Sequence, residues 1–521
     1  MKTLNTRIEK SEYGMLRGFI ILSSTIFFLF SIKQGHNWGG DFALYISHAK
    51  NIALGLPYRD TGYIYNPYSH WYGPVTYPPI FPLLLSFVYR FFGLDLYSMR
   101  VMIVICFAAM LWALDRYCLS RIDNKKIVLA ILITVAFSPY YWETKNSVIS
   151  DIPYTMFLFL SLIVSDKIDQ LENGRKQKIL YSIVFGLLSY LAYGTRSVGI
   201  FIIISYCINQ IVRNKTLPYT LFVSLGIFII LFIAQNVFLH SDTSYIMTMS
   251  TNNGQESDGG IEIYIIEIFA MISSIFHNAY LNTIEYTKVM KWYWQTGASS
   301  FISILMTVTT VILSIIGYIK IFRNNKSTGE INFLIYIIIL IISPFFQGFR
   351  YLIPIFPMYA LYMFKIFDYK AINSDVKAIQ PIRVILTSAI ILIYISAYSK
   401  IEFGPFTYGV GEKETQDMFS FIKNHTPKQS MVIFQKPRLM ALFGERKSTT
   451  YFYETGGDFE SLKFLDHLNE IKATHLVVSN GVWGNAEMVN YVNWVKKPNK
   501  SKRMVYHNSD FEIYEIIVPS N

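Results

Sequence analysis

Long apolar segments alternate with short polar ones along the first 400 residues of the chain. A helix that crosses the hydrocarbon core of a bilayer needs about 20 mostly apolar residues, and by that measure the pattern predicts about eleven membrane-spanning helices. The predicted spans are 16–33, 100–119, 127–142, 152–168, 179–194, 197–212, 217–238, 301–322, 331–347, 351–367 and 382–400. We therefore expect a polytopic α-helical membrane protein.

The segment 79–93 is a shorter apolar stretch that contains two prolines. Proline has a fixed φ and restricts the residue before it, which suits an extended approach to a bent helix. If this segment crossed the membrane, the basic residues in 121–126 would lie on the opposite side from the other basic clusters. We therefore expect an interfacial or half-inserted helix here.

Basic residues gather in the short connections between the apolar segments. The clusters are Lys2–Arg17, Arg116–Lys126, Arg175–Lys178, Arg213–Lys215, Lys320–Lys326 and Lys365–Arg383. With the spans given above, every cluster falls on one side of the membrane, which the positive-inside rule makes the cytoplasmic side. The N-terminus is then cytoplasmic, and an odd number of spans places the C-terminus outside. We expect a multi-pass protein of a bacterial inner (cell) membrane.

Three larger pieces of the chain fall on the outer side: a first loop over 34–99, a second loop over 239–300, and the tail. The tail has soluble patterning, with helix-like segments such as KETQDMFSFIKN and strand-like segments such as THLVVS. It is long enough to bury a core of its own. We expect a membrane domain over 1–400 and a small extracytoplasmic α/β domain over 401–521.

The composition agrees with a membrane protein. Of all residues, 52% are hydrophobic, 17% are aromatic and 16% are charged, whereas a soluble domain has about 25% charged residues. A net charge of +11 is compatible with a nucleic-acid partner. However, the basic residues lie between the spans, where the positive-inside rule explains them. We therefore expect membrane lipids as partners and exclude nucleic acid.

A patterned polar segment follows the first span, at residues 38–58. Asp41, Tyr45 and His48 are four and then three residues apart, so they lie on one face of a helix. A carboxylate near the membrane boundary is unfavourable unless it is hydrated, paired or functional. Asp41 is therefore either a solvated or helix-capping residue or a catalytic one.

Asp151 is a second acidic candidate, where an outer loop turns into a span. Because Pro153 follows in the first turn, Asp151 could serve only as a helix cap. The functional alternative is that Asp151 faces Asp41 across one cavity. Glu143 and Lys145 lie on the same outer loop.

Two arginines interrupt apolar sequence at the outer boundary. Arg196 lies between two spans, and Arg350, followed by Tyr351, begins another. Such side chains can extend to lipid headgroups. They can also bind a phosphate through two parallel hydrogen bonds. For each arginine the sequence supports both interpretations equally.

Histidines on the outer side do not form a metal-binding pattern. His48, His70 and His277 lie there, but the chain contains no HxxxH or HExxH spacing. Such spacing places two imidazoles on one helix face, where they can share a metal ion. We therefore expect no metal site and no cofactor.

Five motifs occur in order along residues 16–400, and the set is more specific than any one of them. They are Asp41–Gly55, Tyr77–Pro82, Ser150–Tyr154, Thr195–Gly199 and Arg350–Pro357. Together they resemble the GT-C glycosyltransferases, polytopic enzymes that take a sugar from a polyprenyl-phosphate carrier. The resemblance is nearest to the dolichyl-phosphate-mannose–protein mannosyltransferases (glycosyltransferase family 39) and to the lipid A aminoarabinose transferases.

The resemblance implies a GT-C fold and transfer of a sugar to an acceptor hydroxyl on the outer face, by one inverting displacement. It implies that Asp41 is the general base, that Asp151 positions the acceptor or the sugar, and that Arg196 or Arg350 contacts the phosphate. Side chains expected around the substrate are Tyr45, His48, Tyr77, Glu143, Lys145 and Tyr351. The acceptor is a protein, a lipid or a polysaccharide.

The chain departs from these families at two positions. Asp41 is followed by Phe42, where many relatives have a second acidic residue. Thr76 and Tyr77 stand where the aminoarabinose transferases carry Glu-Lys. The metal ligand and the phosphate-binding lysine of that subgroup are therefore missing, and we expect neither a metal nor an aminoarabinose substrate.

Two other functions suit a polytopic protein of this kind. An O-antigen ligase would use a diphosphate-linked donor and usually has a key arginine and histidine in a late outer loop, whereas loop 239–300 contains His277 but no arginine. A non-enzymatic lipid-linked sugar flippase would carry charges deep within its spans, whereas the charges singled out here lie at their outer ends. Both stay as alternatives.

Removal of divalent cations should leave sugar transfer unchanged, because the sequence contains no metal-binding spacing. Transfer measured with and without EDTA tests this expectation. A loss of activity that zinc or manganese restores would reveal a metal site.

Overall fold

A computed structural model describes most of the chain. The described residues are 2–66, 74–171, 174–214, 217–239, 261–324, 326–368, 376–451, 459, 462–480 and 486–517. Residues 67–73 of the predicted first outer loop, which include His70, lie outside them, as do residues 240–260 of the second loop.

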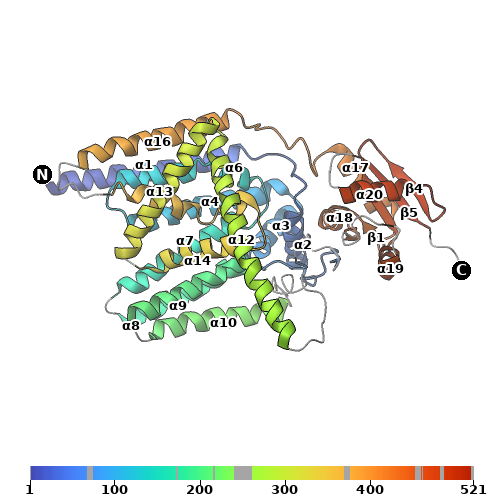
Figure 1. The fold of residues 1–521 in the computed structure, drawn as a ribbon, viewed down its shortest axis with the longest axis horizontal. Helices are drawn as coiled ribbons and strands as arrows, with labels where there is room; N and C mark the ends of the chain where they lie inside the picture. The colour runs from blue at the N-terminus through green and yellow to red at the C-terminus, as the bar shows by residue number, and fades with distance from the viewer. Residues whose placement is uncertain are drawn as a thin grey trace.

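Helices up to residue 398 pack side by side in one bundle (Figure 1). They are α1 (Lys2–Phe30), α2 (Gly40–Leu54), α3 (Ile80–Phe92), α4 (Leu96–Leu119), α5 (Lys125–Ala136), α6 (Pro139–Lys145), α7 (Asp151–Gln170), α8 (Arg175–Thr195), α9 (Ile200–Asn214), α10 (Tyr219–Leu239), α12 (Ile261–Gln295), α13 (Ser300–Asn324), α14 (Thr328–Ile342), α15 (Phe356–Lys365) and α16 (Val376–Tyr398). The 3-10 helices η2 (Ser197–Gly199) and η4 (Gly348–Tyr351) lie between described helices.

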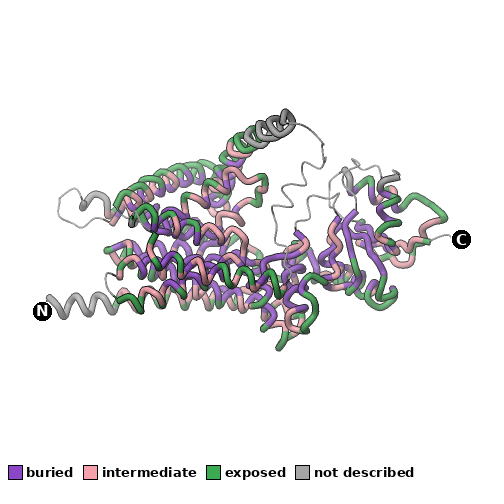
Figure 2. The backbone as a smooth tube through the Cα atoms, turned by 90° about the horizontal axis from the view of Figure 1, so that it is seen from below, coloured by how far each residue is buried: buried purple, intermediate pink, exposed green. Residues whose placement is uncertain are grey.

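Six of the described helices are long and apolar enough to cross a membrane, or seven if the bent pair α5 and α6 forms one span. Large apolar side chains are exposed along the bundle surface, where Figure 2 shows exposed stretches on the outer helices. Examples are Phe19, Phe30, Ile230, Phe238 and Phe301. Lipid is the solvent that such side chains favour, so the chain is an integral membrane protein. The larger number of spans stays a prediction.

The predicted span 127–142 is broken by a bend of 46° between α5 and α6. Ser138 precedes Pro139 and has an extended backbone. A residue before proline is disfavoured in the helical region, and proline itself has no N–H to donate. The bend therefore follows directly from Pro139.

Helix α3 has 13 residues. At 1.5 Å per residue it is about 20 Å long, which is too short for a bilayer core. Phe81 and Leu85 are buried on one face, whereas Phe87 and Phe91 are exposed on another. These two faces suit the interfacial position that we expect for this segment.

The second outer loop contains a helix that is longer than the sequence suggested. Helix α12 has 35 residues and runs obliquely across the other helices of the bundle (Figure 1). It packs on α13 and α14 and reaches η4. The sequence also indicated a polar turn at 250–260, ahead of this helix. That turn is outside the described residues.

The chain beyond residue 401 forms a five-stranded sheet with helices around it (Figure 1). The strands are β1 (Met431–Ile433), β2 (Lys447–Thr449), β3 (His475–Ser479), β4 (Lys502–His507) and β5 (Phe511–Ile516), and the helices are α17 (Lys413–His425), α18 (Pro437–Phe443), α19 (Leu462–Glu470) and α20 (Ala486–Lys496). In the sheet order β2-β1-β3-β5-β4, β1 pairs in parallel with β2 and β3, and β5 pairs antiparallel with β3 and β4. Strand β2 was not expected, because its residues Lys447–Thr449 are all polar and show no apolar position of a strand pattern.

The first outer loop extends the edge of this sheet. The Ser448 N–H on β2 donates to the Gly62 carbonyl at 2.9 Å, and the Ile64 N–H donates to the Ser448 carbonyl at 2.9 Å. Gly62 has φ +76°, and a Cβ there would lie 3.4 Å from the Cβ of Ala441. The positive φ therefore favours glycine at this position.

A second contact joins the segment after α16 to the connection between α1 and α2. The Val410 N–H donates to the His36 carbonyl at 2.9 Å, and the Phe406 N–H donates to the Gln34 carbonyl at 3.0 Å. Nearby, Trp38 belongs to one hydrophobic cluster that continues from the bundle into the C-terminal part. The sheet and the bundle are therefore packed together rather than joined only by the chain.

Arg121 holds three elements together at the end of the bundle opposite α2. Its Nη1 lies 2.6 Å from Oδ2 of Asp166 on α7, and its Nε lies 3.1 Å from Oε1 of Glu330 on α14. It also donates to the Ser327 hydroxyl at 2.8 Å. The side chains of Arg121 and Glu330 are only 4% and 0% exposed, so this charge cluster is structural.

The substitution Arg121→Met should lower the thermal stability of the protein, because it would leave two buried carboxylates without their counter-charge. Removal of one partner from a buried ion pair costs about 3–5 kcal/mol. The apparent melting temperature in detergent measures this effect. Arg116→Met is the matched control, since the Arg116 side chain is 53% exposed. Equal melting temperatures for the two variants would contradict this role of Arg121.

Candidate functional site

Asp41 lies in the first turn of α2. The helix begins there because Gly39, its N-cap residue, has an extended backbone. The free amide groups and the dipole of a helix N-terminus favour a negative charge. The Asp41 side chain is 29% exposed, so a ligand can reach it.

Arg350 joins the two carboxylates that the sequence singled out. Its Nη1 lies 2.6 Å from Oδ2 of Asp41, and its Nε lies 3.2 Å from Oδ2 of Asp151. Asp151 is the first residue of α7, and its side chain is fully buried. Asp41 and Asp151 therefore belong to one cluster. The expected role of Asp151 in positioning an acceptor or a sugar stays a prediction.

Arg196 is the second basic partner of Asp151. It follows the last residue of α8, and its Nη1 donates to Oδ1 of Asp151. The Arg196 guanidinium lies 5.7 Å from the ring centroid of Tyr351, which is within the range of a cation–π contact. The charges predicted at the outer ends of separate spans therefore meet at one end of the bundle.

Tyr77, from the first outer loop, packs against the polar face of α2. Its hydroxyl donates to Oδ1 of Asp41 at 2.7 Å, and its ring stacks on that of Tyr45 at 4.4 Å between centroids. The Tyr77 N–H donates to Nε2 of His48 at 3.4 Å. The Tyr45 hydroxyl lies 2.9 Å from the Ser150 hydroxyl, next to Asp151. Asp41, Tyr45 and His48, which lie on one face of α2, therefore all contact Tyr77.

His48 accepts a hydrogen bond from the main chain of Tyr77. Its side chain is fully buried, and its Nδ1 lies 2.8 Å from the Tyr58 carbonyl oxygen. Burial lowers the pKa of His48 to about 3. A neutral imidazole can donate from Nδ1 and accept at Nε2, which matches these two neighbours. His48 therefore contacts the main chain of both Tyr77 and Tyr58, and its expected contact with substrate stays a prediction.

The cluster contains one residue that the sequence did not indicate. Arg438, on α18 of the C-terminal part, lies 3.2 Å from Oδ1 of Asp41 and donates to the Tyr77 hydroxyl at 3.0 Å. Its side chain is only 5% exposed. The segment PRLMALFG predicted the helix. Nothing in its pattern, however, shows that a side chain from a tail helix reaches a site 397 residues earlier in the chain.

The arginines control the ionisation of Asp41. Burial opposes ionisation, but the guanidiniums of Arg350 and Arg438 outweigh it and hold the pKa of Asp41 well below its usual range. Asp41 is therefore ionised at neutral pH, yet it is a weak base while both guanidiniums contact it. An anion that took over these guanidiniums would leave a carboxylate able to accept a proton.

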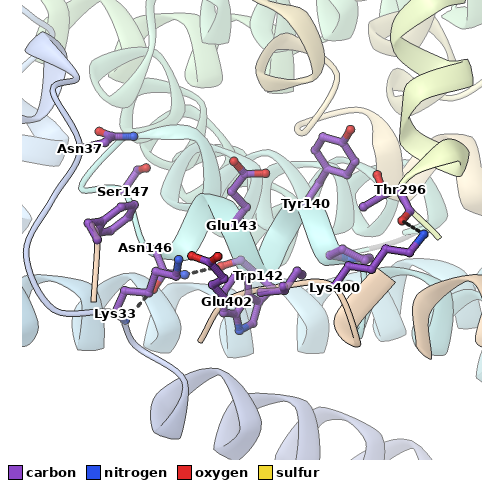
Figure 3. Close-up of a pocket in the computed structure, with 13 residues that line it drawn as sticks. Lys33, Asn37, Tyr140, Trp142, Glu143, Asn146, Ser147, Thr296, Lys400 and Glu402 are labelled. Carbon is purple, nitrogen blue, oxygen red and sulfur yellow. Dashed lines mark hydrogen bonds between the residues drawn. The ribbon is translucent and has the colours of Figure 1, made fainter. Parts of the chain in front are cut away.

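Glu143 lies outside this cluster and lines a pocket of about 400 Å³ between α6, the α1–α2 connection and the segment after α16. Figure 3 shows Glu143 and Tyr140 directed into the pocket from α6. The Tyr140 ring lies 4.3 Å from that of Phe349, the residue before Arg350, so the pocket and the cluster are neighbours. The lining also includes Lys33, Asn37, Thr296, Lys400 and Glu402.

Lys145 lies two residues further along α6 and has a different environment. Its Nζ donates to the Ser31 carbonyl oxygen and, at 3.1 Å, to Oδ1 of Asn146. The residue is fully buried. Lys145 therefore ties α6 to the end of α1, and the structure does not bring it to the carboxylate cluster.

The described residues include no group of three or more His, Cys, Asp or Glu side chains that could hold a metal ion. Asp41 and Asp151 contact arginines rather than further acidic side chains. Among the described residues, the cluster thus pairs guanidinium groups with carboxylates.

The sequence matches no protein-family model and no curated protein. Solved structures, in contrast, match the fold. The oligosaccharyltransferase of Archaeoglobus fulgidus, in complex with zinc and sulfate, superposes with a TM-score of 0.57 at 13% identity over 88% of this chain and 68% of that one. ArnT from Cupriavidus metallidurans, bound to undecaprenyl phosphate, gives 0.55 at 12% identity over 96% of this chain and 98% of that one.

The mycobacterial arabinofuranosyltransferase AftD gives a TM-score of 0.55 at 11% identity over 96% of this chain and 41% of that one. This chain therefore spans less than half of AftD. At identities this low, likeness establishes the fold alone. The chain has the GT-C fold of these membrane glycosyltransferases, as its ordered motifs predicted.

Proposed function

We propose that the protein is a glycosyltransferase that moves a sugar from a polyprenyl-phosphate donor to an acceptor hydroxyl at the outer membrane surface. One observation carries this proposal: three guanidiniums and two carboxylates meet in a single cluster that is partly open. Arginine binds phosphate through paired hydrogen bonds, and a carboxylate beside a phosphate can take a proton from an attacking hydroxyl. The acceptor is a protein, a lipid or a polysaccharide.

The kind of donor is supported by the fold. The ArnT structure, which this chain matches over nearly its full length, contains undecaprenyl phosphate. That ligand belongs to ArnT. Its monophosphate is nonetheless the chemistry that Arg196 and Arg350 would recognise in this protein.

The proposed reaction is one displacement with inversion. The acceptor oxygen attacks the anomeric carbon while Asp41 accepts the hydroxyl proton, and the bond from carbon to phosphate oxygen breaks. The electron pair stays on the departing polyprenyl phosphate, where Arg350 stabilises the charge. Asp151, which is buried between Arg196 and Arg350, holds both guanidiniums in place. General-base catalysis of this kind contributes about 100- to 10,000-fold in rate.

Substrate binding would itself activate the base. When the phosphate takes over hydrogen bonds from Arg350, Asp41 loses a neighbour that keeps its pKa low. A less strongly paired carboxylate accepts protons more readily. Glu143 and its pocket, next to the cluster through Tyr140 and Phe349, are a candidate binding place for the acceptor.

We place the cluster and residues 401–521 on the extracytoplasmic side of a bacterial inner membrane. Helix α7 begins at Asp151 in the cluster and carries Asp166 near its other end, in contact with Arg121. The two ends are about 22 Å apart along the helix. Arg121 belongs to a basic cluster that the positive-inside rule places in the cytoplasm, so Asp151 belongs to the opposite side.

Asp41→Asn should abolish transfer, because an amide cannot accept the proton, while the protein still inserts and purifies normally. The assay uses purified protein in liposomes with radiolabelled polyprenyl-phosphate sugars and measures label that is released or moved to an acceptor. Near-normal activity of the variant would remove Asp41 as the base. No reaction of the wild type with any monophosphate donor would favour a diphosphate-dependent ligase or a flippase.

Arg350→Lys should lower kcat/KM by about tenfold or more, because an ammonium cannot reproduce the forked contacts of a guanidinium with two groups. The same liposome assay measures the effect. Arg213→Lys is the control, since Arg213 pairs with Asp169 at the other end of the bundle and is 39% exposed. Equal activity of the two variants would show that the bridge is not needed.

A further inference from the structure

Arg438 belongs to the C-terminal part, but its hydrogen bonds join it to the first outer loop and α2. It donates to the Pro74 carbonyl at 2.9 Å and to the Tyr77 hydroxyl at 3.0 Å, and it lies 3.2 Å from Oδ1 of Asp41. Its guanidinium also lies 5.0 Å from the ring centroid of Tyr63 and 5.3 Å from that of Tyr77. The side chain is thus held at one place from several directions.

The cluster carries more positive than negative charge. Among the described residues, the guanidiniums of Arg196, Arg350 and Arg438 contact the carboxylates of Asp41 and Asp151. Burial of charge is costly unless the charges are balanced. The arrangement is therefore suited to a further anion.

Lys436, two residues before Arg438 in the chain, is a further basic residue of this segment. Lys436 is close enough to interact with Asp41 and Arg438. Burial lowers the pKa of Lys436, Asp41 opposes that shift, and Arg438 adds to it. An anion placed here would relieve the repulsion between Lys436 and Arg438.

We propose that the C-terminal domain is part of the donor site and that Arg438 binds the phosphate of the lipid-linked sugar. This inference deepens the proposed function and rests on it. The phosphate would enter between Arg350 and Arg438, where the Asp41 carboxylate now lies. It would take one hydrogen bond from each guanidinium, and Asp41 would be freed to act as the base.

We assign to Arg438 the positive charge that the chain does not carry at Thr76 and Tyr77. Helix α18 packs directly on α2 and brings the guanidinium to this position. The main-chain pairing of Ser448 with Gly62 and Ile64 fixes the approach of the domain. Docking of the C-terminal domain is thus needed to complete the site.

The test compares equilibrium binding of undecaprenyl phosphate to the full-length protein in detergent. Arg438→Gln should raise Kd by about tenfold or more, the factor that corresponds to about 1.4 kcal/mol. Arg438→Lys keeps the charge and should bind within about threefold of the wild type, a difference of well under 1 kcal/mol. Arg503→Gln is the matched control, since Arg503 is 67% exposed on β4 of the same domain, and it should bind as the wild type does.

Hydrogen exchange distinguishes loss of the Arg438 contact from undocking of the C-terminal domain. The amides of Ile64 and Ser448 form the hydrogen bonds between the loop and the sheet, so their protection reports docking. Weakened binding by Arg438→Gln with both amides protected supports the proposal. If Arg438→Gln removes the protection of these amides, the binding measured for Arg438→Lys, with both amides protected, is compared instead. Binding by Arg438→Lys close to that of the wild type supports the proposal. Loss of binding by Arg438→Lys contradicts it. Unchanged binding by Arg438→Gln also contradicts it.

Competing ligands identify the source of the phosphate. Inorganic phosphate and phosphatidylglycerol should bind more weakly than undecaprenyl phosphate. Equal, Arg438-dependent binding of phosphatidylglycerol would show a phospholipid headgroup site instead. If the wild type does not bind undecaprenyl phosphate, the proposed donor class itself is contradicted. If the wild type binds it and Arg438→Gln binds it equally well, only the role of the C-terminal domain is contradicted.

Discussion

The guanidinium of Arg350 bridges two carboxylates that begin two different helices, and the candidate site depends on this bridge. Asp41 lies in the first turn of α2 and Asp151 is the first residue of α7, so both helix dipoles favour the negative charges that Arg350 contacts. Arg350 can lie between them because the chain leaves its helical path at η4, between α14 and α15. Without the guanidinium, two carboxylates at neighbouring helix ends would repel each other.

Helix α7 is held by an arginine at each end, and the two arginines differ in exposure. Arg121, which contacts Asp166, is 4% exposed. Arg350, which contacts Asp151, is 24% exposed, and its other partner Asp41 is 29% exposed. In the cluster around Arg121 the charges pair with one another, so removal of one partner would leave a buried charge uncompensated. A partly open cluster can exchange its internal partners for a ligand, which is the property that the proposed reaction uses.

The sequence by itself determined the helices and the faces they present. Apolar segments of sufficient length predict helices in a membrane, and the spacing of Asp41, Tyr45 and His48 predicts one face of α2, because both depend only on local geometry. Arg196 and Arg350 were recognisable because a charge within apolar sequence is costly without a reason. The ordered motifs predicted the GT-C fold that the solved structures share.

Only the tertiary structure decided which of these side chains meet. Glu143 and Lys145 are close in sequence, yet residues two apart on a helix point about 200° apart, and they have separate environments. Arg438 joins Asp41 only because α18 packs on α2 and the first outer loop pairs with β2. Contacts between segments far apart in the chain leave no periodic signal within either segment, so the sequence could not reveal them.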